Sequence, residues 1–135
     1  VNLERAMAAN GRFGGHIVSG HIDGTGKIIS VNAMENAVMY KINIPSSFAK
    51  YCLQKGSITI DGTSLTIFEV ETDIVTISLI HLTRSHTILG SEKVGDIVNI
   101  ELDLLSKYVE KMLGMNERKK ESTITTSFLS QNGYL

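Results

Sequence analysis

The feature that most constrains this chain is a series of short runs rich in Ile, Val and Thr, each closed by a turn signal. Apolar and polar residues alternate in them, and a period of two predicts half-buried β-strands. The clearest runs are Ala37–Ile44, Ser57–Asp61, Ser64–Glu71, Ile74–Leu82 and Val98–Leu102. Turns at Asp61-Gly62 and Thr72-Asp73 are typical of hairpins between such strands.

A further stretch, residues 15–31, predicts one long strand or a strand pair, bent at Gly24 and Gly26. After Pro45, the two serines at 46 and 47 are expected to cap a short helix over residues 48–54. About six short strands with one small helix predict an all-β chain, either an antiparallel barrel or a sandwich, and not a βαβ fold.

The apolar pattern changes beyond Asp103, where it predicts a helix. Its apolar stripe consists of Leu105, Tyr108, Met112 and Met115, at spacings of three and four residues. A short helix is marginal by itself, so the stripe must pack either on its own barrel or on other copies of the chain. Residues 127–133 predict one last short helix.

Composition narrows the function classes. With 135 residues the chain has room for little more than one domain, and its net charge of −1 argues against a nucleic-acid binder. No apolar run approaches the length of a membrane span. The single cysteine, Cys52, has no partner within the chain for a disulfide, which favours the cytoplasm.

A four-residue pattern, V-N-(L/I)-E, occurs at residues 1–4 and again at residues 98–101. The second copy follows a turn signal and forms the last predicted strand. If the first copy is equivalent, residues 1–12 are the last strand of a preceding unit and its linker, residues 13–103 form a complete barrel, and residues 104–135 are a helix and tail. Coincidence of a short match is the alternative.

Four polar constellations could carry chemistry. The first is Gly14–His21, where glycines let a ligand or another backbone come close. As a strand, it would place Ser19 and His21 on one face and His16 on the other, unless a bulge intervenes. The alternatives are a glycine-rich barrel corner and a zinc site at the two histidines, although no further ligand completes that site.

The second constellation is Lys55–Thr66, where Ser64 and Thr66 share a strand face and could hydrogen-bond the edge of a flat heterocycle. A polar hairpin is the alternative. The third, Ile80–Gly90, predicts a loop or a short turn of helix, with a plain surface loop as the alternative. The fourth is Asp103, either an ordinary helix cap or a pocket residue.

Taken together, the motifs resemble the riboflavin synthase family. The matching segments are VNLERAM (1–7), GGHIVSGHIDGTG (14–26), KGSITIDGTSLT (55–66), HTILG (86–90), VGDIVNIELD (94–103), KYVEKML (107–113) and FLSQNGY (128–134). The resemblance implies two tandem six-stranded antiparallel Greek-key β-barrels followed by a C-terminal trimerisation helix. It also implies a homotrimer whose active sites lie between barrels of neighbouring subunits, so this chain corresponds to the C-terminal barrel and helix and supplies half a site.

The reaction implied is a dismutation of two molecules of 6,7-dimethyl-8-ribityllumazine, which gives riboflavin and 5-amino-6-ribitylaminopyrimidinedione without a metal or cofactor. By matched position, the residues expected to be catalytic are His21, Lys55, Ser64 and Asp103, with Ser64 and His21 relaying protons. Those expected to bind substrate are Gly20, Asp61, Gly62, Ser64, Thr66, Ile80 and Thr83. In isolation, this chain is expected not to turn over.

One departure from the family pattern is visible: His81 stands where the family usually has proline, which loosens the backbone beside Ile80 and Thr83. Two other functions compete with the enzyme. A non-catalytic lumazine- or flavin-binding protein would share the fold but lose the polar site residues. This sequence retains His21, Lys55, Ser64 and Asp103, which favours the enzyme. A flavin-binding barrel of a reductase would need an R-x-Y-(S/T) signature, which the sequence lacks.

Overall fold

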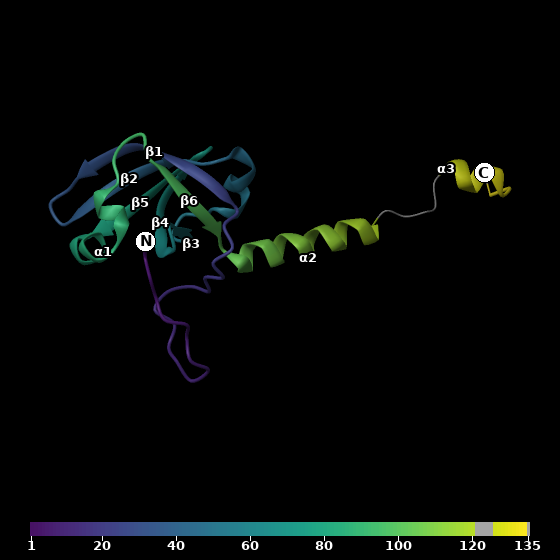
Figure 1. The fold of residues 1–135 in the computed structure, drawn as a ribbon. Helices are drawn as coiled ribbons and strands as arrows, with labels where there is room; N and C mark the ends of the chain where they lie inside the picture. The colour runs from purple at the N-terminus through teal and green to yellow at the C-terminus, as the bar shows by residue number, and fades with distance from the viewer. Residues whose placement is uncertain (121–125, 135) are drawn as a thin grey trace. The chain divides into compact units, whose positions relative to one another are not determined.

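The computed structural model describes residues 1–120 and 126–134, and in residues 115–120, 126 and 128 it describes the backbone without the side chains. Six strands in this part of the chain close into an antiparallel barrel, in the order β1-β2-β5-β4-β3-β6 (Figure 1). They are β1 (Gly24–Ala33), β2 (Ala37–Asn43), β3 (Ser57–Ile60), β4 (Thr63–Glu71), β5 (Ile74–Ile80) and β6 (Ile97–Leu102). Hairpins join β3, β4 and β5, and β6 returns to pair with β3, so the predicted all-β Greek-key barrel is confirmed.

Short helices lie between strands at η1 (Ser46–Tyr51), α1 (His81–His86) and η2 (Ile88–Ser91). After β6, the described residues form two further helices, α2 (Leu104–Lys120) and α3 (Thr126–Gln131). The helix predicted after Pro45 is present, but it is a 3-10 helix that starts two residues earlier. The predicted serine cap is wrong: Pro45 occupies the cap position and no side-chain hydrogen bond caps the helix.

The prediction of a strand over residues 15–31 is also wrong in its first half. Regular pairing begins only at Gly24, and residues 14–23 take an irregular path. The reason is that backbone amides at Ser19 and Gly20 bond to a side chain, Glu101, instead of to a neighbouring strand. The alternation of side chains between the two faces of a strand therefore does not apply to residues 16–21.

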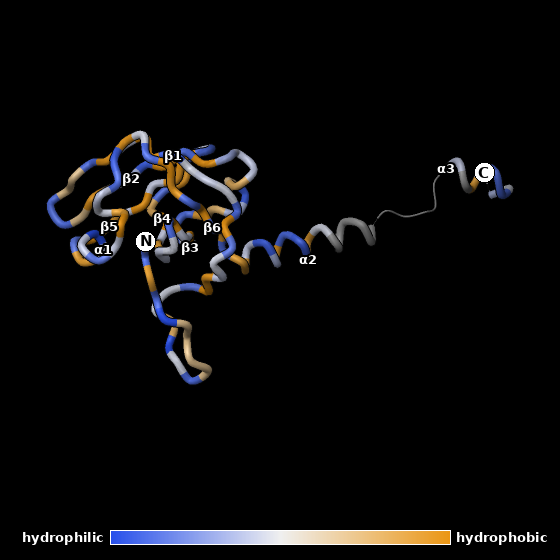
Figure 2. The backbone as a smooth tube through the Cα atoms, viewed as in Figure 1, coloured by the Kyte–Doolittle hydropathy of each residue, from blue (hydrophilic) through white to orange (hydrophobic). Residues whose placement is uncertain are grey.

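The barrel interior is filled by branched aliphatic side chains. Strand β2 shows the expected alternation, with Val38, Tyr40 and Ile42 buried and the residues between them half-buried. Tyr40 donates its buried hydroxyl to the Leu89 carbonyl at 3.0 Å, which fastens η2 to the core. Figure 2 shows apolar and polar residues interleaved along the barrel strands. The interior is thus packed with side chains rather than open as a cavity.

The turn at Asp61-Gly62 fixes the β3–β4 hairpin. Both residues have positive φ, 45° for Asp61 and 79° for Gly62, as a two-residue hairpin turn of type I′ requires. Glycine meets that requirement without steric cost. The turn therefore sets the register in which Thr59 faces Ser64 and Ser57 faces Thr66.

Cys52 is buried behind η1, and burial raises the pKa of its thiol from 9.0 to about 11. Only the thiolate reacts with alkylating reagents. At pH 8 we expect iodoacetamide to label the folded chain about 100-fold more slowly than the urea-unfolded chain, since two pH units separate the two pKa values. Since the folded state holds this proton more tightly, the same effect lowers stability as the pH rises above about 9. Equal labelling rates in both states would contradict this burial.

Residues 105–135 form a second compact unit that contains most of α2 and, within its described part, α3. The short final helix predicted from the sequence is present as α3. On α2, the side chains of Leu105, Tyr108 and Met112 are exposed in this chain. The Met115 side chain, the fourth member of the predicted stripe, lies outside the described residues. In the described parts of the chain, no helix is both long enough and apolar enough to span a bilayer.

Candidate functional site

A row of polar side chains crosses three adjacent strands of the barrel wall. Thr59 on β3 is paired with Ser64 on β4 on one side and with Glu101 on β6 on the other. Their sequence neighbours Ile58 and Leu102 are paired with each other and belong to the core cluster. Since successive side chains on a strand point to opposite faces, the polar row lies on the outer face of the wall.

The row is nevertheless protected from solvent: Thr59 is 0% and Glu101 is 3% exposed. Glu101 accepts three hydrogen bonds from the irregular segment that precedes β1. Its Oε1 accepts from the Ser19 backbone N–H at 2.6 Å and from the Ser19 hydroxyl at 2.8 Å, and its Oε2 accepts from the Gly20 N–H at 3.0 Å. A buried carboxylate is tolerated when its oxygens are satisfied in this way. Glu101 therefore fixes this irregular stretch, residues 14–23, to the barrel wall. We call it the glycine-rich segment.

The imidazole of His16, in the same segment, contacts the hydroxyl of Ser64. The two groups approach at 2.7 Å between Nδ1 and Oγ, and the His16 backbone N–H lies 3.3 Å from the same oxygen. The other ring nitrogen, Nε2, is 3.1 Å from the Thr59 hydroxyl. The imidazole thus bridges the two hydroxyl groups that face each other across the β3–β4 hairpin.

Gly15 makes this approach possible. A Cβ atom at Gly15 would overlap the Oγ and Cβ atoms of Ser64. Only a residue without a side chain lets the backbone lie this close to the hydroxyl. At Gly14, by contrast, a Cβ atom would meet nothing within 4 Å.

A hydroxyl in contact with an imidazole is a recognised arrangement for proton transfer and nucleophilic activation, because a free serine hydroxyl is a weak nucleophile and a weak base. The Ser64 oxygen also faces a backbone N–H, which favours negative charge on it. The site can therefore accept and return a proton. Sequence reasoning placed Ser64 here but paired it with His21.

His21 lies elsewhere in the segment. Its side chain is exposed, its backbone N–H faces the Ser19 hydroxyl at 3.3 Å, and its Nδ1 is 3.2 Å from the Ser19 carbonyl. Lys55 is exposed in a left-handed turn (φ 65°) just before β3, where its N–H donates to the Ile67 carbonyl. Neither residue touches the Ser64–His16 pair through a described hydrogen bond, and their proposed roles stay predictions.

The hairpin turn holds a second group of predicted residues. The Asp61 side chain accepts from the Asn99 N–H at 2.7 Å, and Gly62 follows it in the turn. Asn2 connects this turn to η2: its amide donates to the Asp61 carbonyl at 2.7 Å, and its oxygen accepts from the Ile88 N–H at 3.0 Å. Asn2 was not among the predicted site residues, although it lies in the V-N-(L/I)-E repeat.

Ile80 and Thr83 lie at the end of β5 and in α1. Ile80 is exposed, and α1 begins at His81, the first helical position, where a backbone N–H has no acceptor within the helix. Histidine and proline both suit this first helical position, so the His81 found here is compatible with the start of α1. Thr83 is half-buried and its carbonyl accepts from the Thr87 hydroxyl.

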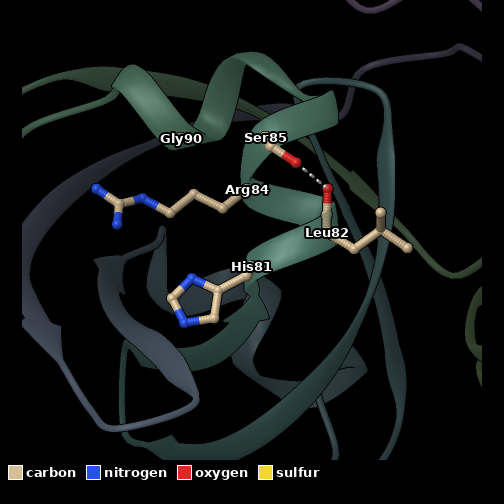
Figure 3. Close-up of a pocket in the computed structure, with 5 residues that line it drawn as sticks. All are labelled: His81, Leu82, Arg84, Ser85 and Gly90. Atoms are coloured by element: carbon tan, nitrogen blue, oxygen red, sulfur yellow. Dashed lines mark hydrogen bonds between the residues drawn. The ribbon is translucent and has the colours of Figure 1, made fainter.

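An open hollow of about 600 Å³ lies beside α1 (Figure 3). It is lined by His81, Leu82, Arg84, Ser85 and Gly90. The His81 and Arg84 side chains extend on the same side of α1, while Ser85 donates to the Leu82 carbonyl at 3.0 Å (Figure 3). Its described lining contains no residue of the polar row, so the hollow and the Ser64–His16 pair are different features.

The two remaining predicted residues are Thr66 and Asp103. Thr66 is exposed on β4, two positions after Ser64. Asp103 directly precedes α2, in the cap position, and is half-buried. In the described residues, no group of three or more His, Cys, Asp or Glu side chains is arranged for a metal ion.

Sequence reasoning missed Glu101, Thr59 and the contact between His16 and Ser64. A glutamate inside the last predicted strand was the available signal for Glu101, because such a charge needs partners when it is buried. No signal for the His16 contact was available, since it depends on an irregular path of the backbone.

Comparison with known proteins identifies the family of this chain. The lumazine binding domain family matches residues 19–103. The riboflavin synthase of Bacillus subtilis (strain 168) is 54% identical over 99% of this chain, and that of Actinobacillus pleuropneumoniae is 48% identical over the same share. The chain spans 63% of the length of each of these relatives.

Solved structures agree with the fold. The structure of LumP complexed with riboflavin has a TM-score of 0.63 and 28% identity, covering 68% of this chain and 50% of that one. LumP complexed with 6,7-dimethyl-8-(1'-D-ribityl) lumazine gives a TM-score of 0.62 at the same identity, over 67% and 51%. With the family match extending from Ser19 to Asp103 across the whole barrel, this chain belongs to the lumazine-binding domain family.

Proposed function

We propose that this chain is the lumazine-binding part of a riboflavin synthase and takes 6,7-dimethyl-8-ribityllumazine as substrate. The observation that carries the proposal is the Ser64–His16 pair on the outer wall, in a chain 54% identical to the Bacillus subtilis riboflavin synthase. The reaction is the dismutation of two lumazines to riboflavin and 5-amino-6-ribitylaminopyrimidinedione. It requires proton transfer and the alignment of two flat rings, and it needs no metal or cofactor.

In this proposal Ser64 exchanges protons with the lumazine. The hydroxyl of Thr66 and the exposed side chain of Ile80 bind the ring, with Thr83 beside them. Gly20 and the Asp61-Gly62 turn lie toward the ribityl chain. His21, Lys55 and Asp103 support charge around the ring.

The assembly is proposed on separate grounds. The exposed stripe of Leu105, Tyr108 and Met112 on α2 is suited to packing against other copies of the helix, which supports a homotrimer. The domain organisation expected from the sequence, with residues 13–103 as one barrel of a two-barrel subunit, accords with the 63% coverage of the relatives. A free, buried Cys52 suits a reducing compartment, and we assign the protein to the cytoplasm.

The second candidate function is a lumazine- or flavin-binding protein without turnover, because LumP structures that carry such ligands share the fold. The polar row separates the two functions. A carrier has no need of a hydroxyl in contact with an imidazole, whereas a proton-transfer enzyme does.

The test joins this chain to the part of the Bacillus subtilis relative that it does not match; we call the product the joined protein. We expect the chain alone to bind the lumazine, seen as a change in lumazine fluorescence, without forming riboflavin. The joined protein should form riboflavin, and Ser64→Ala should lower its turnover about 100-fold or more while lumazine binding stays within about threefold. A joined protein that folds and binds lumazine but forms no riboflavin would favour the carrier.

A further inference from the structure

We propose that the hollow beside α1 binds a phosphorylated small molecule, a phosphate monoester of a sugar or sugar alcohol, whose phosphate is held by Arg84 and His81. The hollow has a volume of about 600 Å³, and its described lining belongs to α1 and η2. The proposal gives the protein a second ligand and does not depend on the proposed function.

Two basic side chains reach into this hollow from one face of α1. His81 and Arg84 are three residues apart on the helix, and their side chains extend on the same side of it (Figure 3). In the described part of the chain, no hydrogen bond or ion pair engages either side chain. A guanidinium group has five N–H donors in a planar fork, and an imidazole has at least one N–H in either protonation state. Both residues therefore offer donors to a ligand in the hollow.

The remaining polar side chain of the described lining is already engaged within α1. The Ser85 hydroxyl donates to the Leu82 carbonyl at 3.0 Å and lies 3.0 Å from Nδ1 of His86. The same Nδ1 is 2.8 Å from the Leu82 carbonyl. These contacts satisfy one another, so the recognition of a ligand is left to Arg84 and His81.

The charge around the hollow favours an anion. Residues 74–91, which include β5, α1 and η2, contain no Asp or Glu, although the chain has 14 acidic residues in 135. Helix α1 packs against β5 and η2, so its described neighbours carry no carboxylate. Glu92, the first acidic residue after η2, bonds its carboxyl to Asp96 instead. A basic pair in such surroundings attracts an anion and has no internal counter-ion to displace.

The number of donors favours a phosphate monoester over a carboxylate. A phosphate monoester presents three acceptor oxygens and about two negative charges. Two of its oxygens can bond the guanidinium fork of Arg84 while the third accepts from His81, whereas a carboxylate has no third oxygen.

The size of the hollow favours an ester over a free phosphate ion. A volume of about 600 Å³ lies in the range of sites that hold a whole small molecule. The described lining contains no Phe, Tyr or Trp on which a flat ring could stack. A hydroxylated carbon chain therefore suits the remaining space better than an aromatic group does.

Gly90 forms the second wall of the hollow. A Cβ atom there would overlap the carbonyl of Arg84, so glycine lets η2 lie directly against the α1 backbone. The hydrogen bond from the buried Tyr40 hydroxyl to the Leu89 carbonyl fastens η2 to the core. This wall is in place without a ligand, which lowers the cost of ordering the site on binding.

Nitrogen-15 NMR of the chain tests the site. Ribose 5-phosphate is the probe for the ester, and inorganic phosphate and ribose represent its two halves, all at constant ionic strength. We expect ribose 5-phosphate to shift the backbone amide resonances of His81, Arg84 and Gly90 saturably, with a dissociation constant in the millimolar range. Inorganic phosphate should shift the same amides with a larger dissociation constant, and ribose should shift none of them.

Variants identify the groups that hold the phosphate. Arg84→Gln should weaken ribose 5-phosphate binding about 10-fold or more, because a charge-assisted hydrogen bond is lost. Arg84→Lys keeps the charge without the fork and should recover only part of the affinity. His81→Pro removes the imidazole donor but suits the first helical position, so it should weaken binding about threefold to tenfold with α1 intact.

The matched control is Arg12→Gln, which removes the same group from an exposed position outside the described lining of the hollow. Its dissociation constant should stay within about twofold of the original, because distant exposed charges are screened by salt. If it weakens binding as much as Arg84→Gln does, the ester responds to overall charge and the hollow is not a site.

Two further outcomes would contradict the proposal. Equal affinity for inorganic phosphate and ribose 5-phosphate would show that the hollow holds only the free ion, and the ester would be wrong. Shifts at Arg84 and Gly90 that do not saturate with any of the probes would overturn the site itself. Lumazine is absent from all these measurements, so the proposed function is tested separately.

Discussion

Replacing Gly15 by alanine is expected to lower riboflavin formation by the joined protein about 100-fold or more while the barrel stays folded. The new Cβ would overlap Ser64 Oγ, so either the glycine-rich segment or the Ser64 side chain must move. A shift of about 1 Å between reacting groups costs on the order of 100-fold in rate. Initial rates of riboflavin formation measure the effect, and thermal unfolding checks the fold.

Gly14→Ala is the matched control. It adds the same methyl group one residue earlier, where nothing lies within 4 Å. It should retain turnover within about twofold, and its stability should change by no more than about 1 kcal/mol. Equal losses in both variants would show that flexibility of the segment, rather than its contact with Ser64, controls the rate.

Replacing Glu101 by glutamine is expected to release the glycine-rich segment from the wall. The amide nitrogen of glutamine cannot accept hydrogen bonds, so either the Gly20 N–H or the Ser19 donors lose their acceptor. Loss of a bond to a charged group costs about 1.5–3 kcal/mol. That cost should appear as about 10- to 100-fold faster hydrogen exchange at the Ser19 and Gly20 amides, because those amides exchange through local opening.

The companion variant is Glu69→Gln, which makes the same chemical change at an exposed position of β4. Its free energy of unfolding should stay within about 0.5 kcal/mol of the original, as surface substitutions usually do. Core amides such as that of Ile77 should exchange equally in both variants, since β5 does not depend on the segment. If Ser19 and Gly20 exchange no faster in Glu101→Gln, the carboxylate does not hold them.

Much of the barrel could be predicted from the sequence, because its strands carry the period of two over most of their length. The hairpin at Asp61-Gly62 was identified from the dipeptide alone, and its positive φ angles explain why. The segment before β1 could not be predicted. Its residues alternate like a strand, but the hydrogen bonds that would pair it go instead to Glu101, 82 residues from Ser19 along the chain.

The same long-range contacts limited the prediction of the site. Ser64 and Thr66 follow directly from strand parity on β4, and the structure places them on one face. The parity of a regular strand would put His16 on the opposite face from Ser19, but it does not apply because the segment is irregular, and His16 contacts Ser64. Its approach to Ser64 depends on the bare backbone at Gly15 and on the anchor at Glu101, neither of which is local to the histidine.

The curvature of the barrel wall limits how much of a flat ligand can be buried beside Ser64. The interior is solid with aliphatic side chains, and a closed wall curves away from whatever rests on its outside. A planar ring system laid on a convex support presents its second face to water, whereas tight small-molecule sites bury about 70–90% of their ligand. Strong retention of one ring therefore requires a group that covers its second face. A second planar ring stacked on the first would provide that cover, and in the proposed dismutation it would also be the other reactant.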